Sequence, residues 1–392
     1  MIPTRTSFIL FVIALFMIQS DSDMNETDIT FFLSGDVMTG RGMDQILANP
    51  VRPLLYESYV KDARHYVELA ERVNGPIQKP VPFEYVWGFA LEELDIRKPD
   101  IRLINLETSI TTSENPWEDK GVHYRMHPAN IPVLRVGGID VVSLANNHTL
   151  DWGREGLAET LRSLKSEGIP FVGAGSDLQG AARPIMKEVR GTRLWIFGVG
   201  MTDSGIPAGW RATERASGLF LLEDYSENSL EKLQGKIRQY AKPGDIVVVS
   251  IHWGGNWGYD TPQRQCDFAH RLIDFGGVDL VHGHSSHHVK GFEVYKNKLI
   301  LYGCGDLITD YEGISGHESY RSDLGLLYFV TLTGDGDLKN LEMVPTTMKR
   351  LQLVPPSRNQ TEWLLEVLEK ESILRENSIE KTPSGTFRLK IL

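Results

Sequence analysis

Cysteine is scarce in this chain: Cys266 and Cys304 are the only two among 392 residues. Two cysteines cannot build the disulfide framework that holds many small secreted domains together. A single bridge between them is left open by the sequence. Because 41% of the residues are hydrophobic, the chain has enough apolar surface to fold around one large core or two smaller ones instead.

An excess of positive charge is also lacking. Lys and Arg total 41 against 52 Asp and Glu, which gives a formal net charge of −11. No block of basic residues offsets this charge, so a nucleic acid is not expected as a partner. An anionic polymer or a small anionic substrate would need positive charge supplied locally, by metal ions or by individual arginines.

Long hydrophobic runs are absent apart from residues 8–18, "FILFVIALFMI". This run is too short to cross a bilayer as a helix. With Arg5 before it and the polar "QSDSD" after it, the run has the pattern of a secretory signal over residues 1–23. We therefore expect a secreted, extracellular protein, with retention at the membrane through an uncleaved N-terminal anchor as the alternative. Asn25 and Asn359 stand in glycosylation sequons.

What the chain does have is a regular alternation of short apolar segments with amphipathic ones. Buried strands are predicted at residues 28–33, 101–106, 140–144, 193–199, 245–251 and 278–283, and antiparallel strands at 324–332, 338–344 and 347–354. Helices are predicted at 154–167, 229–240, 263–275 and 361–376, with Asp151 as a candidate N-cap of the first and Gly168 at its end. This pattern predicts an α/β domain over residues 24–355, followed by a C-terminal helix and tail over 356–392.

Residues 49–100 interrupt this alternation. The segment is long, rich in proline and aromatic residues, and contains two predicted helices. A cap over one face of the domain and a peripheral surface insertion are both compatible with such a segment.

Polar residues stand where the predicted strands end. They are Asp36, Asn105, Glu107, Asn146, Asn147, His148, His252, His284, His287 and His288. The carboxyl ends of the strands in an open α/β sheet share one edge, which is where ligands bind. Carboxylate, amide and imidazole groups together suit Mn, Fe or Zn better than Mg or Ca. The sequence therefore predicts a site for one or two divalent metal ions at this edge.

Each of these residues also has a simpler explanation when taken alone. A single Asp after a strand is more often a helix cap or turn residue than a ligand, and Asn146 and Asn147 suit turns. The histidine-rich stretch at 282–288 is compatible with a solvated loop. His282 lies within a strand and His288 lies one step past the loop, so both are expected to pack or to support a ligand. The repetition at five strand ends favours the metal site.

Five segments resemble, in order, the signature segments of the CapA-type capsule-synthesis proteins. They are "GDVMTGR", "NLETSIT", "LANNHTLDWG", "SIHWG" and "GHSSHHVKGFEVYKNKLILYGCGDLI". That family is linked to poly-γ-glutamate synthesis, and its fold is similar to that of calcineurin-like metallophosphatases. The resemblance covers roughly residues 28–350. It implies an α/β fold, a metallophosphatase-like four-layer αββα sandwich of mixed β-sheets flanked by helices.

The resemblance also implies roles for individual residues. The implied metal ligands are Asp36, Glu107, Asn147, His252, His284 and His287, with Glu107 as a candidate bridging carboxylate. His148 would protonate the leaving group or steady the transition state, and Asp151 would orient it. Arg41 and Arg125 are candidates to grip an anionic substrate. Asp306 is a candidate additional ligand, whereas Cys304 is expected to be structural.

Two functions follow from these roles. The first is a secreted metal-dependent hydrolase that acts on a phosphoester or on a γ-glutamyl amide bond. The second is a non-catalytic factor that binds poly-γ-glutamate, or another anionic polymer, for assembly or export. Metallophosphatases begin with Asp-x-His, whereas Asp36 is followed here by Val37 and Met38, and this difference favours the second function. A metal-binding extracellular domain without a substrate is a third interpretation.

Overall fold

Two β-sheets packed face to face form the centre of the computed structural model, which describes residues 26–392. The first sheet has the order β20 (Ser378–Lys381), β21 (Phe387–Lys390), β18 (Leu338–Lys349), β17 (Leu324–Leu332), β1 (Ile29–Val37), β2 (Ile101–Leu106), β5 (Val141–Ser143) and β6 (Phe171–Val172), with β16 (Asp306–Ile308) on β1 and β19 (Gln352–Val354) on β18. The predicted signal over residues 1–23 and the sequon at Asn25 lie outside the described residues.

The second sheet has the order β11 (Leu221–Leu222), β9 (Thr192–Met201), β12 (Ile246–His252), β13 (Leu280–His284), β15 (Lys298–Leu301) and β14 (Phe292–Tyr295), with β8 (Ile185–Val189) on β9. Two short ladders join β3 (Ser109–Ile110) to β4 (Arg125–Met126) and β7 (Ala174–Gly175) to β10 (Gly218–Leu219). In both sheets the central strands run parallel, and antiparallel strands extend the sheets outward.

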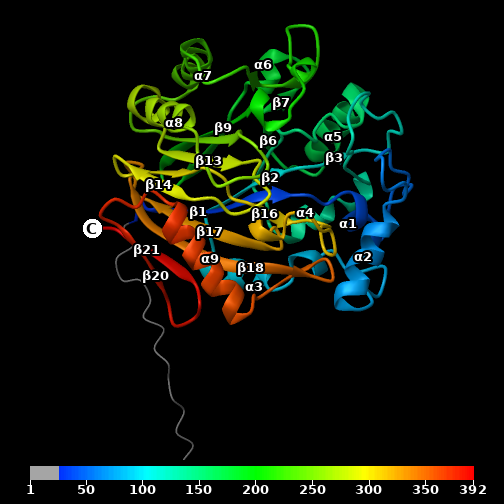
Figure 1. Cartoon of the computed structure of the whole chain (residues 1–392). Coiled ribbons are helices and arrows are strands. Elements are labelled where there is room, and N and C mark those ends of the chain that lie inside the picture. The colour runs from blue at the N-terminus through cyan, green and yellow to red at the C-terminus, as the bar shows by residue number, and fades with distance from the viewer. Residues whose placement is uncertain (1–25) are drawn as a thin grey trace, which may run out of the picture.

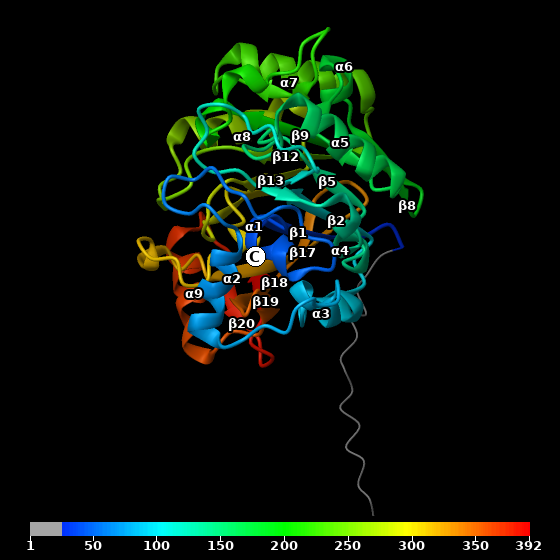
Figure 2. The ribbon, with the colours of Figure 1, turned by 90° about the vertical axis from the view of Figure 1, so that its right-hand side faces the viewer.

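Helices cover the outer face of each sheet. The helices are α1 (Arg41–Ile46), α2 (Arg64–Asn74), α3 (Ala90–Arg97), α4 (Pro132–Val136), α5 (Gly153–Ser166), α6 (Leu178–Ala181), α7 (Glu227–Tyr240), α8 (Gln263–Gly276) and α9 (Arg358–Glu371). α1 to α5 pack on the first sheet, and α7 and α8 pack on the second. Figures 1 and 2 show the layers in the order helices, sheet, sheet, helices. The predicted four-layer αββα sandwich is confirmed.

Strand β12 shows how the sequence produces these layers. Ile246 and Val248 point into the core between the two sheets, whereas Val247, Val249 and Ile251 point into the core beneath α7 and α8. A strand that is buried on both faces reads as a continuous apolar run, as "IVVVSI" does. Because side chains alternate along a strand, this pleat directs Ser250 and His252 between the sheets at the carboxyl end.

Most predicted elements occur at or near their predicted positions, and the differences have local causes. α9 begins at Arg358, three residues before the predicted start, because Ser357 and Gln360 form a capping box. Residues 347–354 do not form one separate strand: β18 continues through to Lys349, and a tight turn at Arg350 and Leu351 separates it from β19. Asp151 does not cap α5: the N-cap residue is Trp152, with no side-chain cap bond.

The segment after α9, which the sequence predicts as a tail, contains regular secondary structure. Residues after α9 form the β20–β21 hairpin, and β21 pairs with β18 at the edge of the first sheet. Cys266 and Cys304 are both buried and free, so the bridge that the sequence left open is not formed. None of the helices within residues 26–392 is long and apolar enough to cross a membrane.

Residues 49–100 contain the two predicted helices, α2 and α3, joined by an irregular stretch with a short 3₁₀ turn at Tyr85–Trp87. α2 packs against α1, directly after the carboxyl end of β1. Trp87 is fully buried, and its indole N–H donates to the backbone carbonyl of Val133 at 2.7 Å. The segment is therefore tied into the first sheet's helical layer.

Candidate metal centre

The carboxyl ends of β1, β2, β12 and β13 deliver their polar residues to one place, as predicted. Strand register produces much of this convergence. On β1, Asp36 pairs with Asn105 of β2 on one side and with Asp306 of β16 on the other. On the second sheet, His252 of β12 pairs with His284 of β13. Neighbouring parallel strands therefore place these side chains at the edge where ligands bind in open α/β sheets.

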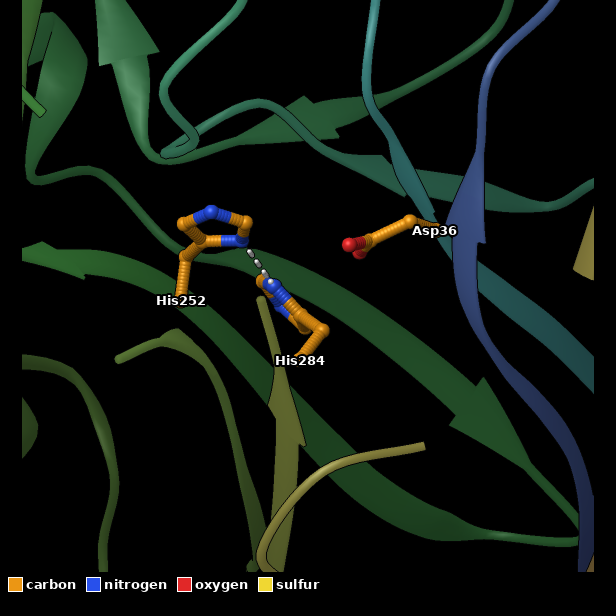
Figure 3. A group of neighbouring side chains, drawn as sticks. All are labelled: Asp36, His252 and His284. Atoms are coloured by element: carbon orange, nitrogen blue, oxygen red, sulfur yellow. Dashed lines mark hydrogen bonds between the residues drawn. The ribbon is translucent and has the colours of Figure 1, made fainter. Parts of the chain in front are cut away.

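Two groups of potential ligand atoms share the carboxylate of Asp36. The first group is Asp36, His252 and His284, and the second is Asp36, Glu107, His287 and Asp306. In each group, one ligand atom per residue lies within 4.8 Å of all the others, and every member is buried. Figure 3 shows Asp36 facing the two imidazoles of the first group. The carboxylate common to both groups is thus Asp36, whereas Glu107, the predicted bridge, belongs to one of them.

Several buried polar atoms at this centre have no hydrogen-bond partner within residues 26–392. They are Oδ2 of Asp36, both carboxylate oxygens of Glu107, Oδ1 of Asn147, Nε2 of His252 and Oδ2 of Asp306. A buried polar atom without a partner costs about 1–3 kcal/mol, so a cluster of them needs a compensating ligand. All of them are atom types that bind divalent metals. The residues present therefore fit a metal centre.

Asparagine side chains hold the ligands in place. Nδ2 of Asn105 donates to Oδ1 of Asp36 at 2.7 Å, which leaves Oδ2 of Asp36 free. Asn146 donates in turn to Oδ1 of Asn105 at 3.0 Å and accepts the backbone N–H of His148 at 3.1 Å. Groups of this kind orient metal ligands. Asn105 and Asn146, which stand at predicted strand ends, are therefore supports of the centre.

The protein groups by themselves create electrostatics that are unfavourable for the carboxylates of this centre. Burial, together with the neighbouring carboxylate of Asp306, raises the pKa of Asp36 to about 8. Burial and the charge of Asp36 raise the pKa of Glu107 well above its usual range. Burial lowers the pKa of His252 and His284, so both are held neutral. A neutral imidazole is the form that binds metal, and a cation would stabilise both carboxylates.

His287 differs from the other two histidines because it lies among carboxylates. Its Nδ1 is 3.1 Å from Oδ1 of Asp306. Burial by itself lowers the pKa of His287, but Asp306 and Asp36 outweigh burial and leave this pKa raised. His288 lies outside both groups and stacks on Tyr320 with ring centroids 4.9 Å apart. This placement agrees with the packing role expected for His288.

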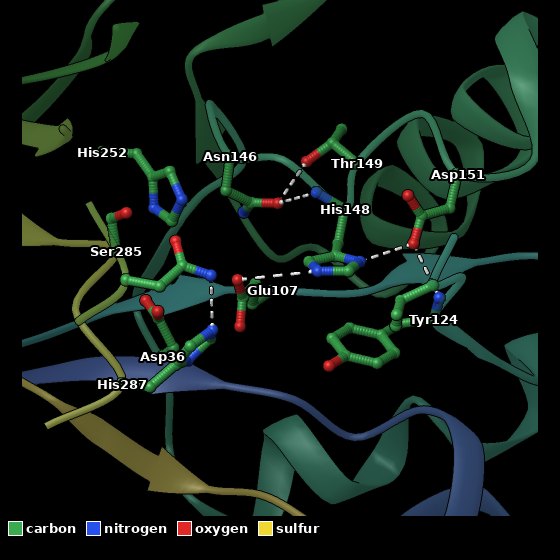
Figure 4. Close-up of polar contacts among 12 residues, drawn as sticks. Asp36, Glu107, Tyr124, Asn146, His148, Thr149, Asp151, His252, Ser285 and His287 are labelled. Carbon is green, nitrogen blue, oxygen red and sulfur yellow. Dashed lines mark hydrogen bonds and ion pairs between the residues drawn. The ribbon is translucent and has the colours of Figure 1, made fainter. Parts of the chain in front are cut away.

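Beside the second group, His148 forms a dyad with Asp151. Its Nδ1 lies 2.6 Å from Oδ2 of Asp151, and its Nε2 faces Oε1 of Glu107 at 3.9 Å (Figure 4). Tyr124 stacks on the imidazole ring at 3.8 Å between centroids, and its backbone N–H donates to Asp151 at 2.6 Å. The imidazole is thus held so that Nε2 points toward the ligand groups.

Lys120 is a member of this site that the sequence did not reveal. Its Nζ donates to Oδ1 of Asp151 at 2.5 Å and lies 3.1 Å from Nδ1 of His148. Burial lowers the pKa of His148 well below its usual value, and the Lys120 charge adds to this effect. Burial raises the pKa of Asp151 to about 6, whereas Lys120 opposes that rise. A lone lysine in an irregular loop gives no sequence signal of such a role.

The comparison with known proteins identifies the family. Residues 30–311 match the family described as bacterial capsule synthesis protein PGA_cap. The chain belongs to this family. A probable polyglutamine synthesis accessory protein of Mycobacterium tuberculosis (strain H37Rv) is 47% identical over 351 residues, which are 89% of this chain and 92% of that protein.

Two further relatives of the PGA_cap chain are more distant. The PGA biosynthesis protein CapA of Bacillus subtilis (strain 168) is 28% identical over 297 residues, 75% of this chain and 70% of that protein. The capsule biosynthesis protein CapA of Bacillus anthracis is 24% identical over 282 residues, 72% of this chain and 60% of that protein. All members of both ligand groups lie inside the matched PGA_cap region, residues 30–311.

A cavity of about 930 Å³ opens beside the candidate metal centre. His287 and Tyr124 line it, as do Tyr66 from α2 and Trp257 from the loop after β12. The cavity therefore borders both His287, a proposed metal ligand, and Tyr124, whose ring stacks on His148. Because α2 belongs to residues 49–100, this segment forms part of the wall.

The two arginines predicted to grip a substrate occupy different places. Arg41 lines the cavity, but its guanidinium is already paired with Glu57 and Asp310. Arg125 is not among the cavity-lining residues: it donates to the backbone carbonyls of Ser113 and Arg52 and stacks on Trp152 at 3.9 Å. The structure thus gives Arg125 a supporting position and pairs the charge of Arg41 with two buried carboxylates.

Proposed function

We propose that the chain is a metal-dependent hydrolase that cleaves a phosphoester or a γ-glutamyl amide bond during the synthesis of a capsule polymer. The observation that carries this proposal is the position of His148. Its Nε2 faces the second ligand group, and its Nδ1 is held by Asp151. A histidine that can pass a proton from the attacking water to the leaving group, next to two ligand groups, suits metal-assisted hydrolysis.

The proposed centre holds two divalent ions. The first group offers two imidazoles and one carboxylate, a set that suits Zn or Fe. Asn147, which directly precedes His148 in the sequence, has an unpartnered Oδ1 within the described residues. The second group offers three carboxylates and one imidazole, a set that suits Mn. Bound ions of this kind supply an activated water and stabilise a developing oxyanion.

The chain's own residues supply the remaining chemistry. The neutral ring of His148 carries its proton on Nδ1, which Asp151 holds. Nε2 therefore first takes up the proton that the attacking water releases and then gives that proton to the leaving group. Lys120 keeps Asp151 ionised. Tyr124 packs against the ring and shields the dyad from water on that face. Each of these contacts is present before a substrate binds, which lowers the cost of reaching the transition state.

The link to capsule polymers rests on the relatives. Two of them are named for capsule or PGA biosynthesis, and poly-γ-glutamate, the polymer to which the resemblance points, is anionic. An acidic protein can bind such a polymer where cations focus positive charge, and the metal centre would do so here. The signal-like residues 1–23 support a location outside the cytoplasm for this reaction.

A non-catalytic role is the alternative, since one relative is named an accessory protein. Metal content and the hydrolysis of chromogenic phosphoesters and of poly-γ-glutamate should therefore be measured on the same purified protein. The hydrolase proposal expects turnover that His148→Ala abolishes while metal content is kept, with His127→Gln, outside both ligand groups, as the control. Metal binding with no turnover of either substrate class would favour the accessory role. A wild-type protein that binds no metal would overturn both metal-based proposals.

A further inference from the structure

Behind the first ligand group, a chain of buried hydrogen bonds crosses from one sheet to the other. Nε2 of His282 lies 2.7 Å from the backbone carbonyl oxygen of Ser34, on β1. Nδ1 of His282 lies 3.1 Å from Oγ of Ser250, and that oxygen lies 3.0 Å from Nε2 of His284. All four residues are fully buried. The chain therefore ends on a proposed metal ligand without contacting solvent.

The strand pleat explains why these residues meet. His282 and His284 continue the inward-facing series of Leu280 on β13, and Ser250 continues that of Val248 on β12. Register pairs Ser250 directly with His282. Apolar side chains fill this face elsewhere between the sheets. A histidine and a serine at such positions cost desolvation energy, which their complete pairing offsets.

The first bond sets the direction of the whole chain. A carbonyl oxygen can only accept, so His282 must carry its proton on Nε2 and donate to Ser34. Neither of its partners is a carboxylate, so a charged imidazole would be buried without a counter-ion. The neutral ring therefore offers Nδ1 as an acceptor.

The remaining protons follow from this start. Ser250 has one hydroxyl proton, and its hydroxyl donates that proton in the hydrogen bond to Nδ1 of His282. Oγ of Ser250 must then accept, which places the proton of His284 on Nε2. If the Ser250 hydroxyl donated to Nε2 of His284 instead, Oγ of Ser250 and Nδ1 of His282 would face each other with lone pairs only. Such a buried, unmade hydrogen bond is costly.

We propose that His282 and Ser250 are positioning residues that fix His284 in the tautomer with its lone pair on Nδ1. That atom lies 2.8 Å from Nδ1 of His252, so it points toward the first ligand group. Assignment of Nδ1 as a metal ligand rests on the metal centre of the proposed function. The tautomer itself does not, because the hydrogen bonds alone determine it.

Imidazole ¹⁵N–¹H correlation spectra of the metal-free wild-type protein test the tautomer directly. The proposal expects protonated Nε2 and unprotonated Nδ1 for both His282 and His284. A protonated Nδ1 on His284 would overturn it. This measurement needs no variant and does not depend on metal binding or on activity.

Chelator competition with Zn²⁺ tests the consequence for the ligand. Ser250→Ala and His282→Leu are expected to weaken Zn²⁺ affinity about 10–100-fold, as loss of a supporting hydrogen bond does at other metal sites. His282→Gln keeps a donor for Ser34 and an acceptor for Ser250, so it should restore most of the affinity. His288→Gln, at a buried histidine outside the chain, is the matched control.

The outcomes separate the two proposals. If wild-type protein binds Zn²⁺ but Ser250→Ala and His282→Leu, both folded, bind it within twofold of wild type, the positioning role is wrong. A His282→Gln variant as weak as His282→Leu would also contradict it, because packing rather than proton order would then decide affinity. Failure of the wild-type protein to bind Zn²⁺ would refute the metal centre and Nδ1 as a ligand, whereas the spectra still decide the tautomer.

Discussion

Nδ1 of His148 and Oδ2 of Asp151 lie 2.6 Å apart, and Lys120 holds the other oxygen of the same carboxylate at 2.5 Å. This pairing fixes the tautomer of His148 with a proton on Nδ1 when the ring is neutral. It also keeps Nε2 directed at the ligand groups. We therefore expect Asp151→Asn to lower kcat by about 10²-fold or more, since a positioned general acid contributes about 10²–10⁴-fold.

The measurement is steady-state hydrolysis, accompanied by metal analysis of the same samples. Metal content of Asp151→Asn should stay at the wild-type level, because Asp151 belongs to neither ligand group. The loss should fall on kcat with little change in KM. A variant with wild-type kcat would show that the dyad takes no part in the reaction.

Removal of Lys120 should change the pH dependence of the same reaction. Burial raises the pKa of Asp151 to about 6, and Lys120 opposes this rise. Asp151 must be ionised to accept from Nδ1 of His148, so activity should fall as the pH falls through about 6. In Lys120→Met the opposing charge is lost, so the pKa of Asp151 rises further and the acidic limb of the kcat/KM profile moves to higher pH.

Arg64→Met provides the control for Lys120→Met, because Arg64 is an exposed cation paired with Asp62 on the surface. Its pH profile should match that of the wild-type protein. A Lys120→Met profile that shifts to lower pH, or not at all, would contradict the assigned role of Lys120.

The sharing of Asp36 predicts different metal stoichiometries for three variants. Asp36→Asn removes a carboxylate from both groups, whereas His252→Ala affects only the first and Asp306→Asn only the second. We expect Asp36→Asn to lose most of its bound metal, and the other two each to keep up to one ion. Elemental analysis after dialysis measures this.

Asp44→Asn is the matched control for these variants, since Asp44 is a buried carboxylate that accepts hydrogen bonds outside both groups. Its metal content should equal that of the wild-type protein. If His252→Ala and Asp306→Asn lose the same ion, or if Asp36→Asn keeps both, the division into two groups is incorrect.

The sequence predicted the residues at strand ends better than it predicted their partners. The ends of β1, β2, β12 and β13 could be located because each is a short apolar run that stops at a polar residue. By contrast, the place of Asp306 depends on the parallel pairing of β16 with β1, two strands that lie 270 positions apart in sequence at the Asp36–Asp306 pair. Local periodicity contains no information about such a pairing.

Side chains from irregular segments were predicted least well. Lys120 lies in a loop without periodicity, and the partners of Arg41 come from the segment after α1 and from the loop after β16. From the sequence, an arginine near a predicted anionic site suggests a substrate contact. Only the fold reveals that Glu57 and Asp310 already occupy that guanidinium.

The fourth prediction concerns the stability of this buried arginine. Nε of Arg41 donates to Oδ2 of Asp310 at 2.8 Å, and Nη1 donates to Oε1 of Glu57 at 2.9 Å. The guanidinium lies over the Tyr66 ring, 3.6 Å from its centroid. Asp310 and Glu57 are fully buried. Arg41→Met therefore leaves two buried carboxylates unpaired, and we expect it to lower the free energy of unfolding by about 3–5 kcal/mol.

Urea unfolding of metal-free protein measures this change without interference from the centre. Arg41→Lys should recover only part of the loss, because a lysine cannot pair with Asp310 through two parallel bonds. Arg64→Met, which breaks an exposed pair, should cost at most about 1 kcal/mol. Tyr311, next to Asp310, forms a hydrogen bond with Tyr124, which stacks on His148, and both tyrosines line the cavity.

Arg41→Met could lower the free energy of unfolding no more than Arg64→Met does. That result would mean that the ion pairs of Arg41 with Glu57 and Asp310 do not stabilise this wall of the cavity.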